Sequence, residues 1–69
     1  MKKKRVCDNI AELFFESKKT QQLFGDSIGV AQGSVGHWIN HGHDPNSKWI
    51  PRIAAFFDVP ITRLFEGVE

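Results

Sequence analysis

The first apolar positions of the chain recur with the period of a helix. They fall at i, i+4, i+7, i+8 and i+11, and the members of this stripe are Val6, Ile10, Leu13, Phe14 and Ser17. Because this spacing places them on one face, it predicts an amphipathic helix over roughly residues 6–17. Asp8 lies near its start, where the helix dipole favours a carboxylate. Phe15 lies off the stripe, so we expect it to be partly exposed.

The segment TQQLFGDSIGVAQGSVGHWIN, residues 20–40, predicts two short helices joined by a tight turn. Its inward-facing positions in a helical period are Phe24, Ile28, Val35 and Trp38. Thr20 caps the first helix through its hydroxyl group. Gly29 interrupts the pattern between the helices, and we expect Val30 to fill the corner. Gly25 lies where the two helices approach most closely, which favours a residue without a side chain.

The remaining pattern predicts a loop and two more helices. The second helix of the pair is expected over roughly residues 31–39, because Asn40 and Gly42 tolerate positive φ and favour its end. The sequence HGHDPNSK, residues 41–48, reads as a loop. A fourth helix is expected over about 50–58, with Pro51 in its first turn, where no N–H is needed. A short fifth helix follows over about 61–66, so five helices and no strand predict an all-α fold.

Length and composition fit one small domain. A chain of 69 residues leaves no room for a second domain, and an apolar fraction of 41% is too high for disorder. We assign residues 6–69 to this domain and residues 1–5 to a flexible basic arm. The arm's basic residues, which either contact phosphates or remain solvated, are Lys2, Lys3, Lys4 and Arg5.

Charge and cysteine content indicate where in the cell the protein resides, but they do not identify a binding partner. The net charge is only +1. Cys7 is the single cysteine, which excludes an internal disulfide and suits a reducing cytoplasm. No segment has the length and apolarity of a membrane span, and no apolar stretch follows the basic head as in a signal peptide. We therefore expect a cytoplasmic protein that does not interact with membranes.

The outer face of the second helix of the pair carries only small or hydrogen-bonding residues, namely Gln32, Gly33, Ser34, Gly36 and His37. No acid lies among them, and an acid there would face phosphates. A helix, a tight glycine turn and a second helix make up the helix-turn-helix unit, whose second helix enters a DNA major groove. The pattern therefore favours DNA as the partner.

These residues resemble the lambda-repressor-like helix-turn-helix family, and by pattern the repressors and Cro proteins of lambdoid phages. The likeness covers nearly the whole chain from Ile10 to Gly67, including the later segment WIPRIAAFFDVPITRLFEG. The positions that carry it are Gly25, Gly29, Val35, Trp38 and residues 59–67. The resemblance implies a sequence-specific regulator of transcription in a bacterial host. Such a protein binds double-stranded DNA and needs no cofactor and no small-molecule substrate.

The resemblance also implies which residues meet the DNA. Gln21 matches a glutamine that contacts a phosphate and braces the glutamine matched by Gln32. The positions that face base edges are Gln32, Gly33, Ser34 and His37. Phosphate contacts are expected from Gln21, Asn40, His43, Asn46, Lys48, Lys3 and Lys4. Family members pair through the fifth helix, so Ile61 and Phe65 are expected to join two copies on a near-palindromic site.

Three positions depart from the family pattern. Lys19 stands where an apolar residue is usual, and Leu23 stands where glutamate is usual, which leaves an exposed apolar side chain. Many members pair an arginine with a glutamate where this chain has Phe14 and Ile39. We expect an apolar contact between these two residues, because a buried ion pair often gives no net stability over well-packed apolar groups.

Other interpretations of single residues stay open. Gln32 also fits a solvated surface glutamine, and His37 also fits an exposed histidine without a role. Asn46 and Lys48 either hold phosphates or keep the loop soluble. A metal site is not expected, because His37 and His41 straddle a helix end and no cysteine or acid cluster completes four ligands.

Two other classes of function compete with DNA binding. A protein-binding module, such as an antitoxin-type partner subunit, can share this fold. A module of this kind is expected to present an extended apolar surface. The residues that are able to form one are Phe15, Leu23, Trp49 and Phe56. An enzyme is not expected, because the chain shows no nucleophile–base pair, no glycine-rich phosphate loop before a helix and no paired acids.

Overall fold

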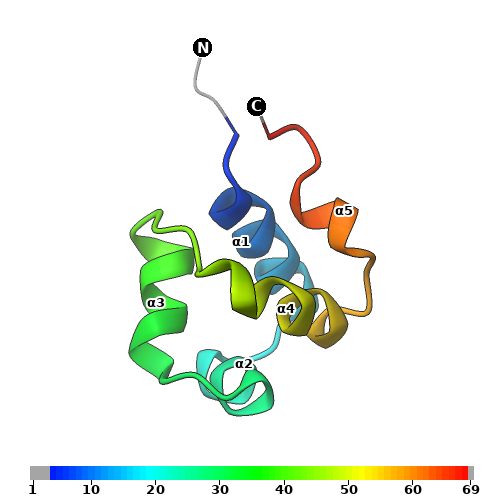
Figure 1. The fold of residues 1–69 in the computed structure, drawn as a ribbon. Helices are drawn as coiled ribbons and strands as arrows, with labels where there is room; N and C mark the ends of the chain where they lie inside the picture. The colour runs from blue at the N-terminus through cyan, green and yellow to red at the C-terminus, as the bar shows by residue number, and fades with distance from the viewer. Residues whose placement is uncertain (1–3, 69) are drawn as a thin grey trace.

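The computed structural model of the 69-residue chain describes residues 4–68, which form a bundle of short helices (Figure 1). The elements are α1 (Val6–Ser17), α2 (Gln21–Ile28), α3 (Gln32–Asn40), the 3-10 turn η1 (Ser47–Trp49), α4 (Ile50–Phe56) and α5 (Ile61–Leu64). Within residues 4–68, β pairing is confined to an isolated bridge between Lys4 and Val68. The all-α prediction is therefore confirmed. None of the helices in this range is long and apolar enough to cross a membrane.

Local capping explains why α1 has the bounds that the apolar stripe predicts. The backbone N–H of Arg5 donates to Asp8 Oδ2 at 2.9 Å, and the Asp8 N–H donates to the Arg5 carbonyl at 3.0 Å, so the two residues cap the start of α1. Lys18 then adopts a left-handed φ of 58°, which ends the helix. The Thr20 cap of α2 is also confirmed, because its hydroxyl oxygen accepts from the Leu23 N–H at 3.1 Å.

The later helices differ slightly from their predicted bounds. α3 runs over Gln32–Asn40 rather than residues 31–39, and α4 ends at Phe56 rather than at Asp58. Asp58 has a φ of 56°, which no helical residue adopts, so the chain turns before reaching it. α5 likewise ends at Leu64, and a turn carries the chain on to Gly67, with φ of 75°.

The turn between α2 and α3 depends on two glycines, as predicted. Gly29 has a φ of 86°, and its N–H donates to the Gly25 carbonyl at 2.8 Å. The next N–H, from Val30, donates to the same carbonyl at 2.9 Å. A Cβ on Gly25 would lie only 2.8 Å from the Val30 carbonyl oxygen. The backbone therefore approaches so closely that α3 keeps this position relative to α2 only with glycine at residue 25.

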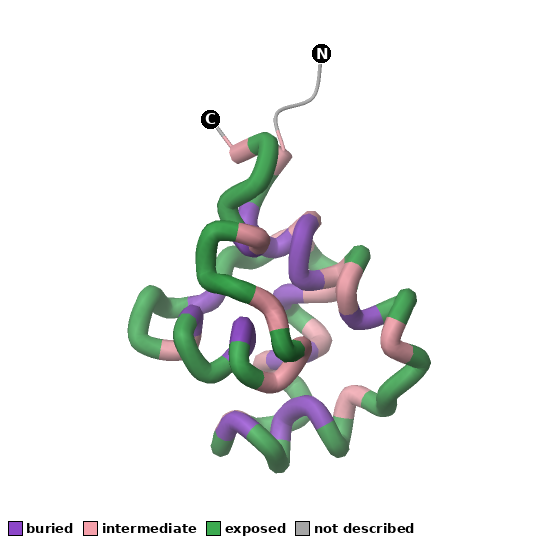
Figure 2. Tube along the Cα trace, turned by 90° about the vertical axis from the view of Figure 1, so that its right-hand side faces the viewer, coloured by how far each residue is buried: buried purple, intermediate pink, exposed green. Residues whose placement is uncertain are grey.

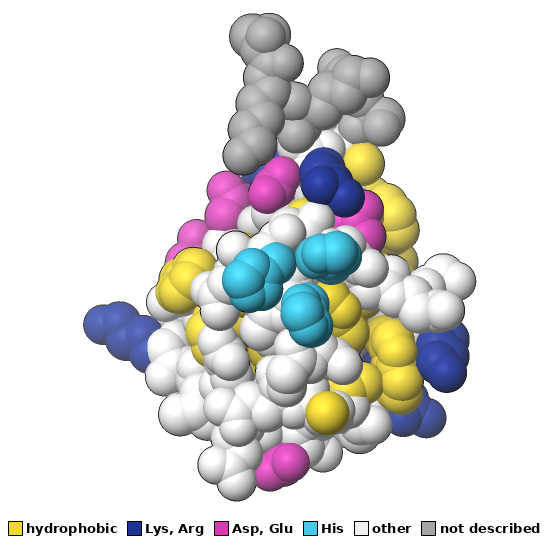
Figure 3. All heavy atoms as spheres, turned by 90° about the vertical axis from the view of Figure 1, so that its left-hand side faces the viewer, with side chains coloured by type: hydrophobic (Ala, Val, Ile, Leu, Met, Phe, Trp, Pro, Cys, Tyr) yellow, Lys and Arg dark blue, Asp and Glu magenta, His cyan; other side chains and the backbone are white. Residues whose placement is uncertain are grey.

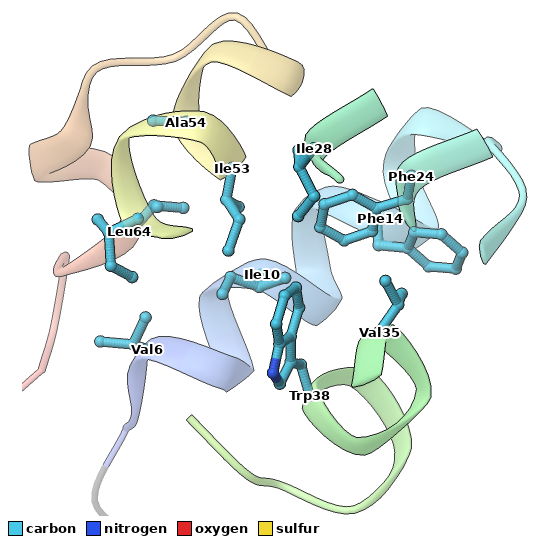
Figure 4. Packing of buried hydrophobic residues seen from close by; sticks show 11 residues of the cluster. Val6, Ile10, Phe14, Phe24, Ile28, Val35, Trp38, Ile53, Ala54 and Leu64 are labelled. Atoms are coloured by element: carbon cyan, nitrogen blue, oxygen red, sulfur yellow. The ribbon is translucent and has the colours of Figure 1, made fainter. Parts of the chain in front are cut away.

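Aromatic side chains fill the core around Phe24 (Figure 4). The ring of Phe24 stacks on Phe56 at 4.8 Å between centroids and on Phe14 at 6.0 Å. Its edge contacts are with Phe57 at 5.1 Å and Trp38 at 6.1 Å. The buried apolar cluster comprises Val6, Ile10, Phe14, Phe24, Ile28, Val35, Trp38, Ile50, Ile53, Ala54 and Leu64. Every α-helix contributes to it, so the bundle shares one core.

Asn9 is a buried polar residue that the sequence pattern did not single out. Its side chain is fully buried, and Nδ2 donates to the carbonyl oxygens of Leu64 at 2.7 Å and Glu66 at 3.0 Å. These bonds satisfy carbonyls at the end of α5 and tie that end to α1. The bridge between Lys4 and Val68 joins the same two parts of the chain.

Buried positions recur at helical intervals along the trace, and exposed positions lie between them (Figure 2). Phe15 and Leu23 are 64% and 48% exposed, as expected from their positions. Trp49, another of the apolar residues considered for a protein-binding surface, is half-buried. Phe56 is not a free surface residue, because it stacks on Phe24 and the Lys19 ammonium lies 4.5 Å from its ring centroid. The lysine that departs from the family pattern therefore covers an aromatic ring.

Candidate nucleic-acid interface

α3 lies at one edge of the bundle, on the far side of α1 from α5 (Figure 1). Val35 and Trp38 point into the core and are buried, and Ile39 packs against the core at its margin. The other residues of α3 form its outer face. The exposed ones are Gln32, Gly33, His37 and Asn40, and the half-buried ones are Ser34 and Gly36. All four residues expected at base edges therefore lie outside the buried face of α3.

Two residues that are expected to contact phosphates, Gln21 and Asn40, have side-chain atoms next to Gly36. A Cβ on Gly36 would lie 3.6 Å from Gln21 Oε1 and 4.0 Å from Asn40 Nδ2. The side chain of Gln21 therefore reaches from the start of α2 to the middle of α3. Among residues 4–68 no hydrogen bond joins Gln21 to Gln32, so the expected brace between them stays a prediction about the DNA complex.

The loop after α3 folds back over the helix end. The N–H groups of His41 and His43 both donate to the His37 carbonyl, at 3.2 and 3.1 Å. The ring centroid of His37 consequently lies 5.5 Å from that of His41 and 5.6 Å from that of His43. These three exposed residues, here called the histidine cluster, gather on one surface (Figure 3). Within residues 4–68 no group of three or more His, Cys, Asp or Glu is arranged to hold a metal ion.

Asp44 fastens this loop to the start of α1, a role that the sequence pattern did not suggest. Its Oδ1 accepts from the Cys7 backbone N–H at 3.1 Å, and its Oδ2 lies 3.8 Å from Arg5 Nη2. Burial raises the pKa of the Cys7 thiol to about 11, and the hydrogen bond and negative charge of Asp44 act in the same direction. Cys7 is therefore a neutral core residue at physiological pH.

Asn46 and Lys48 precede Trp49 in the sequence and contact residues close to them in the chain. Asn46 Oδ1 accepts from the Lys48 N–H at 3.0 Å and caps η1. The Lys48 ammonium lies 5.0 Å from the Trp49 ring centroid and stays exposed. Arg52, which the sequence pattern also did not single out, lies over the same ring and donates from Nη1 to the Ile28 carbonyl at 3.1 Å. It thereby satisfies a carbonyl at the end of α2.

The expected basic arm differs from the structure at its last two residues. Lys4 Nζ lies 3.0 Å from Glu12 Oε2, and Arg5 contributes to the cap of α1 and pairs with Asp44. Both side chains are therefore held against the domain, and the Lys4 ammonium already has a carboxylate partner. Lys3 lies outside the described residues.

Ile61 and Phe65, the expected dimer contacts, are 45% and 46% exposed at α5. Their exposure leaves apolar surface available for a contact. Whether two copies pair there stays a prediction.

Fixed charge is absent from α3 itself, whose sequence QGSVGHWIN contains no Lys, Arg, Asp or Glu. Figure 3 shows lysine and arginine side chains mainly at the margins of this face, acidic side chains near its upper and lower ends, and the histidines with apolar and other uncharged groups between them. Amide, hydroxyl and imidazole groups both donate and accept hydrogen bonds. The face is therefore suited to a polar partner that presents donors and acceptors.

Comparison of the chain with protein-family models, curated proteins and solved structures found no match. The function of this face therefore has to be argued from its own geometry.

Proposed function

We propose that the protein is a sequence-specific double-stranded DNA-binding regulator of transcription, of the repressor or Cro type, with α3 as the helix that enters the major groove. The observation that carries this proposal is the division of α3 into two faces. Val35 and Trp38 fasten one face to the core, whereas the other face is polar and free of acids. Gly25 and Gly29 hold α2 against the start of α3, and this close packing supports the assignment of α2 and α3 to a DNA-binding helix-turn-helix unit.

The small residues of α3 also support the proposal. Gly33 has no heavy atom within 4 Å of its absent Cβ, so its backbone is open to solvent. With Ser34 and Gly36 on the same helix, little side-chain bulk separates the helix axis from a partner. Because the major groove is only about 12 Å wide, a slender helix approaches the base edges more closely than a bulky one.

Gln32 and Gln21 are the residues to which we assign the leading contacts. Gln32 is the first residue of α3 and exposed, and its amide is able to pair with adenine N6 and N7. Gln21 is the first residue of α2, where free helix N–H groups favour a phosphate. Asn40, His43, Asn46 and Lys48 supply further phosphate contacts beyond the end of α3.

Assembly and location follow from the same proposal. Ile61 and Phe65 join two copies on DNA, which then occupy half-sites about 34 Å apart in a near-palindromic operator. The contact is small, so the free protein is expected to associate weakly. The protein acts in the bacterial cytoplasm, on the host nucleoid.

A protein-binding function of the antitoxin type is the second candidate, and one observation favours it. Phe15 on α1 and Leu23 on α2 are 64% and 48% exposed. Such side chains are available for a protein partner whether or not the chain also binds DNA.

Selection of bound sequences from random duplex DNA tests the proposal. We expect enrichment of a near-palindromic site, and Gln32→Ala is expected to lose preference at one base position in each half-site. Binding of the selected duplex should weaken steeply with salt, since phosphate contacts release counterions. Failure to retain any duplex at low salt, together with no retention on heparin, would reject DNA binding and leave the protein-binding candidate.

A further inference from the structure

The histidine cluster concentrates every histidine of the chain at the C-terminal end of α3. The chain has 3 histidines, and all are exposed at this one place (Figure 3). Their rings are close because the His37 carbonyl accepts from the backbone N–H groups of both His41 and His43. Main-chain bonds thus hold together the backbone positions that carry the three side chains.

Two residues of opposite charge, Arg5 and Asp44, lie at the loop that carries His41 and His43. Arg5 Nη1 is 3.9 Å from the Cβ position of Gly42, and the guanidinium and carboxylate are 3.8 Å apart. The other charged residues of the elements that pack on α3 or follow it are Asp8, Glu12 and Glu16 of α1, Asp26 of α2 and Lys48 of η1. None belongs to α3, so His37 is the one residue of α3 with an ionisable side chain, and His41 and His43 lie beside it in the loop that follows.

Resting on the proposed function, we propose that the histidine cluster is a proton-coupled phosphate site, at which DNA binding loads protons onto His41, onto His43 and onto His37, which also faces the base edges. Histidine is the side chain whose charge ordinarily changes between about pH 5 and 8. A phosphate placed against rings whose centroids are only 5.5 and 5.6 Å apart lies close to more than one of them. Its negative charge favours the protonated form of the imidazoles that it contacts.

The coupling makes operator affinity depend on pH. Because linkage is reciprocal, protons that DNA binding loads onto the cluster strengthen DNA binding in return. Each proton taken up changes the affinity about tenfold per pH unit while the histidines titrate. Each imidazolium that meets a phosphate also steepens the slope of log affinity against log salt by about 0.9. The protein is therefore expected to hold DNA more tightly, and with more salt sensitivity, on the acidic side of neutrality.

The test measures affinity for a short random-sequence duplex and for the duplex recovered by selection, at about pH 6 and about pH 8. Both are needed because phosphate contacts act on any sequence. A chelator in the buffer prevents a metal ion from bridging the imidazoles. The variant H37Q/H41Q/H43Q replaces three exposed rings with neutral amides, and circular dichroism at both pH values checks its fold. If the triple variant unfolds, the single variants His41→Gln and His43→Gln take its place.

We expect the unaltered protein to bind both duplexes at least about tenfold more tightly at the lower pH, and the triple variant to change less than about twofold. Lys48→Gln is the matched control: it removes a fixed charge from neighbouring η1, so it should weaken binding equally at both pH values. Affinity that is independent of pH overturns the inference and leaves the proposed function standing. An equal pH dependence in the triple variant also overturns it, because the protons then load elsewhere. Absence of DNA binding at every pH and at low salt rejects the proposed function and the inference together.

Discussion

The side chain of Gln21 in α2 occupies the space that Gly36 leaves free on α3. Its Oε1 atom lies 3.6 Å from the position that a Cβ on Gly36 would take, and Asn40 Nδ2 lies 4.0 Å from the same point. The lack of a side chain at Gly36 therefore lets hydrogen-bonding groups from two places in the chain lie against the middle of α3.

Gly36→Ala is expected to stabilise the fold and weaken DNA binding. Separations of 3.6 and 4.0 Å are ordinary van der Waals contacts, so the added methyl group fits. Alanine inside a helix is more stable than glycine by about 0.5–1 kcal/mol. In the proposed complex, however, the methyl group stands between Gln21 and Asn40 on the DNA-facing side. Urea denaturation and duplex affinity measured on the same sample check both halves, and unchanged affinity would place the DNA elsewhere.

Gly25→Ala is expected to destabilise the protein, in contrast to the same change at Gly33. A Cβ at residue 25 would lie 2.8 Å from the Val30 carbonyl oxygen, so backbone has to move, at a cost of about 1–3 kcal/mol. At residue 33 nothing lies within 4 Å, and alanine should add about 0.5–1 kcal/mol. Thermal unfolding of the two variants should therefore shift in opposite directions. A shift in the same direction would mean that α2 and α3 do not approach closely at residue 25.

Phe14→Ala is expected to cost about 3–5 kcal/mol of unfolding free energy, because the ring is buried and stacks on Phe24. Phe15→Ala is the matched control: this neighbour is 64% exposed and contacts Phe14 edge-on, so its loss should cost less than about 1.5 kcal/mol. A double-mutant cycle with Ile39→Ala measures the expected contact between Phe14 and the end of α3. A coupling energy near zero would contradict that contact and the replacement of an ion pair by apolar packing.

Local signals were enough to predict much of the fold. The stripe of α1, the Thr20 cap and the positive φ of Gly29 each depend on residues within a few positions, so the sequence alone specifies them. The end of α4 is not specified by nearby residues in this way, because Asp58 adopts its left-handed conformation where the chain turns toward α5. A polar residue such as Asn9 is normally assigned to the surface. Its burial becomes evident only once Leu64, 55 residues away, supplies a carbonyl acceptor.

Part of the candidate site was also predictable, because the spacing of apolar residues within α3 is a local signal. Gln32 and Gly33 lie on the outer face of α3 because Val35 and Trp38 fix its inner face by spacing alone. The histidine cluster was not predictable from spacing, because a helix end separates His37 from His41 and a return of the loop is needed to bring His43 back. The pairing of Lys4 with Glu12 likewise depends on how the residues before α1 lie against it.

Stability is expected to fall at alkaline pH because of Cys7. Burial raises the pKa of its thiol from 9.0 to about 11, so the folded state favours the neutral thiol. The stabilisation is fully present below about pH 9 and is lost as the pH rises through about 11, a change of roughly 2 kcal/mol. Denaturation curves at both pH values, compared with those of Cys7→Ala, isolate this contribution. The variant should lose less stability over that interval, and an equal loss would assign the effect to other groups.

Gln32→Ala and Gln21→Ala provide the sharpest test of the proposed DNA complex. Gln32 is exposed at the start of α3, and pairing of its amide with adenine is worth about 1–3 kcal/mol of discrimination. Its replacement should therefore flatten preference at one base position of each half-site while nearly sparing non-specific binding. Gln21→Ala should weaken binding and also blur that position, because the brace on Gln32 is lost.

The double variant separates bracing from independent contacts. If Gln21 positions Gln32, the two losses in affinity should be less than additive, as for other coupled neighbours. Gln22→Ala is the matched control, since this adjacent glutamine is exposed on α2 and has no assigned contact, so its affinity should stay unchanged. Equal weakening of all sequences by Gln32→Ala would instead make Gln32 a backbone contact. Base specificity would then have to come from Ser34 and His37, which share the outer face of α3 and lie three residues apart.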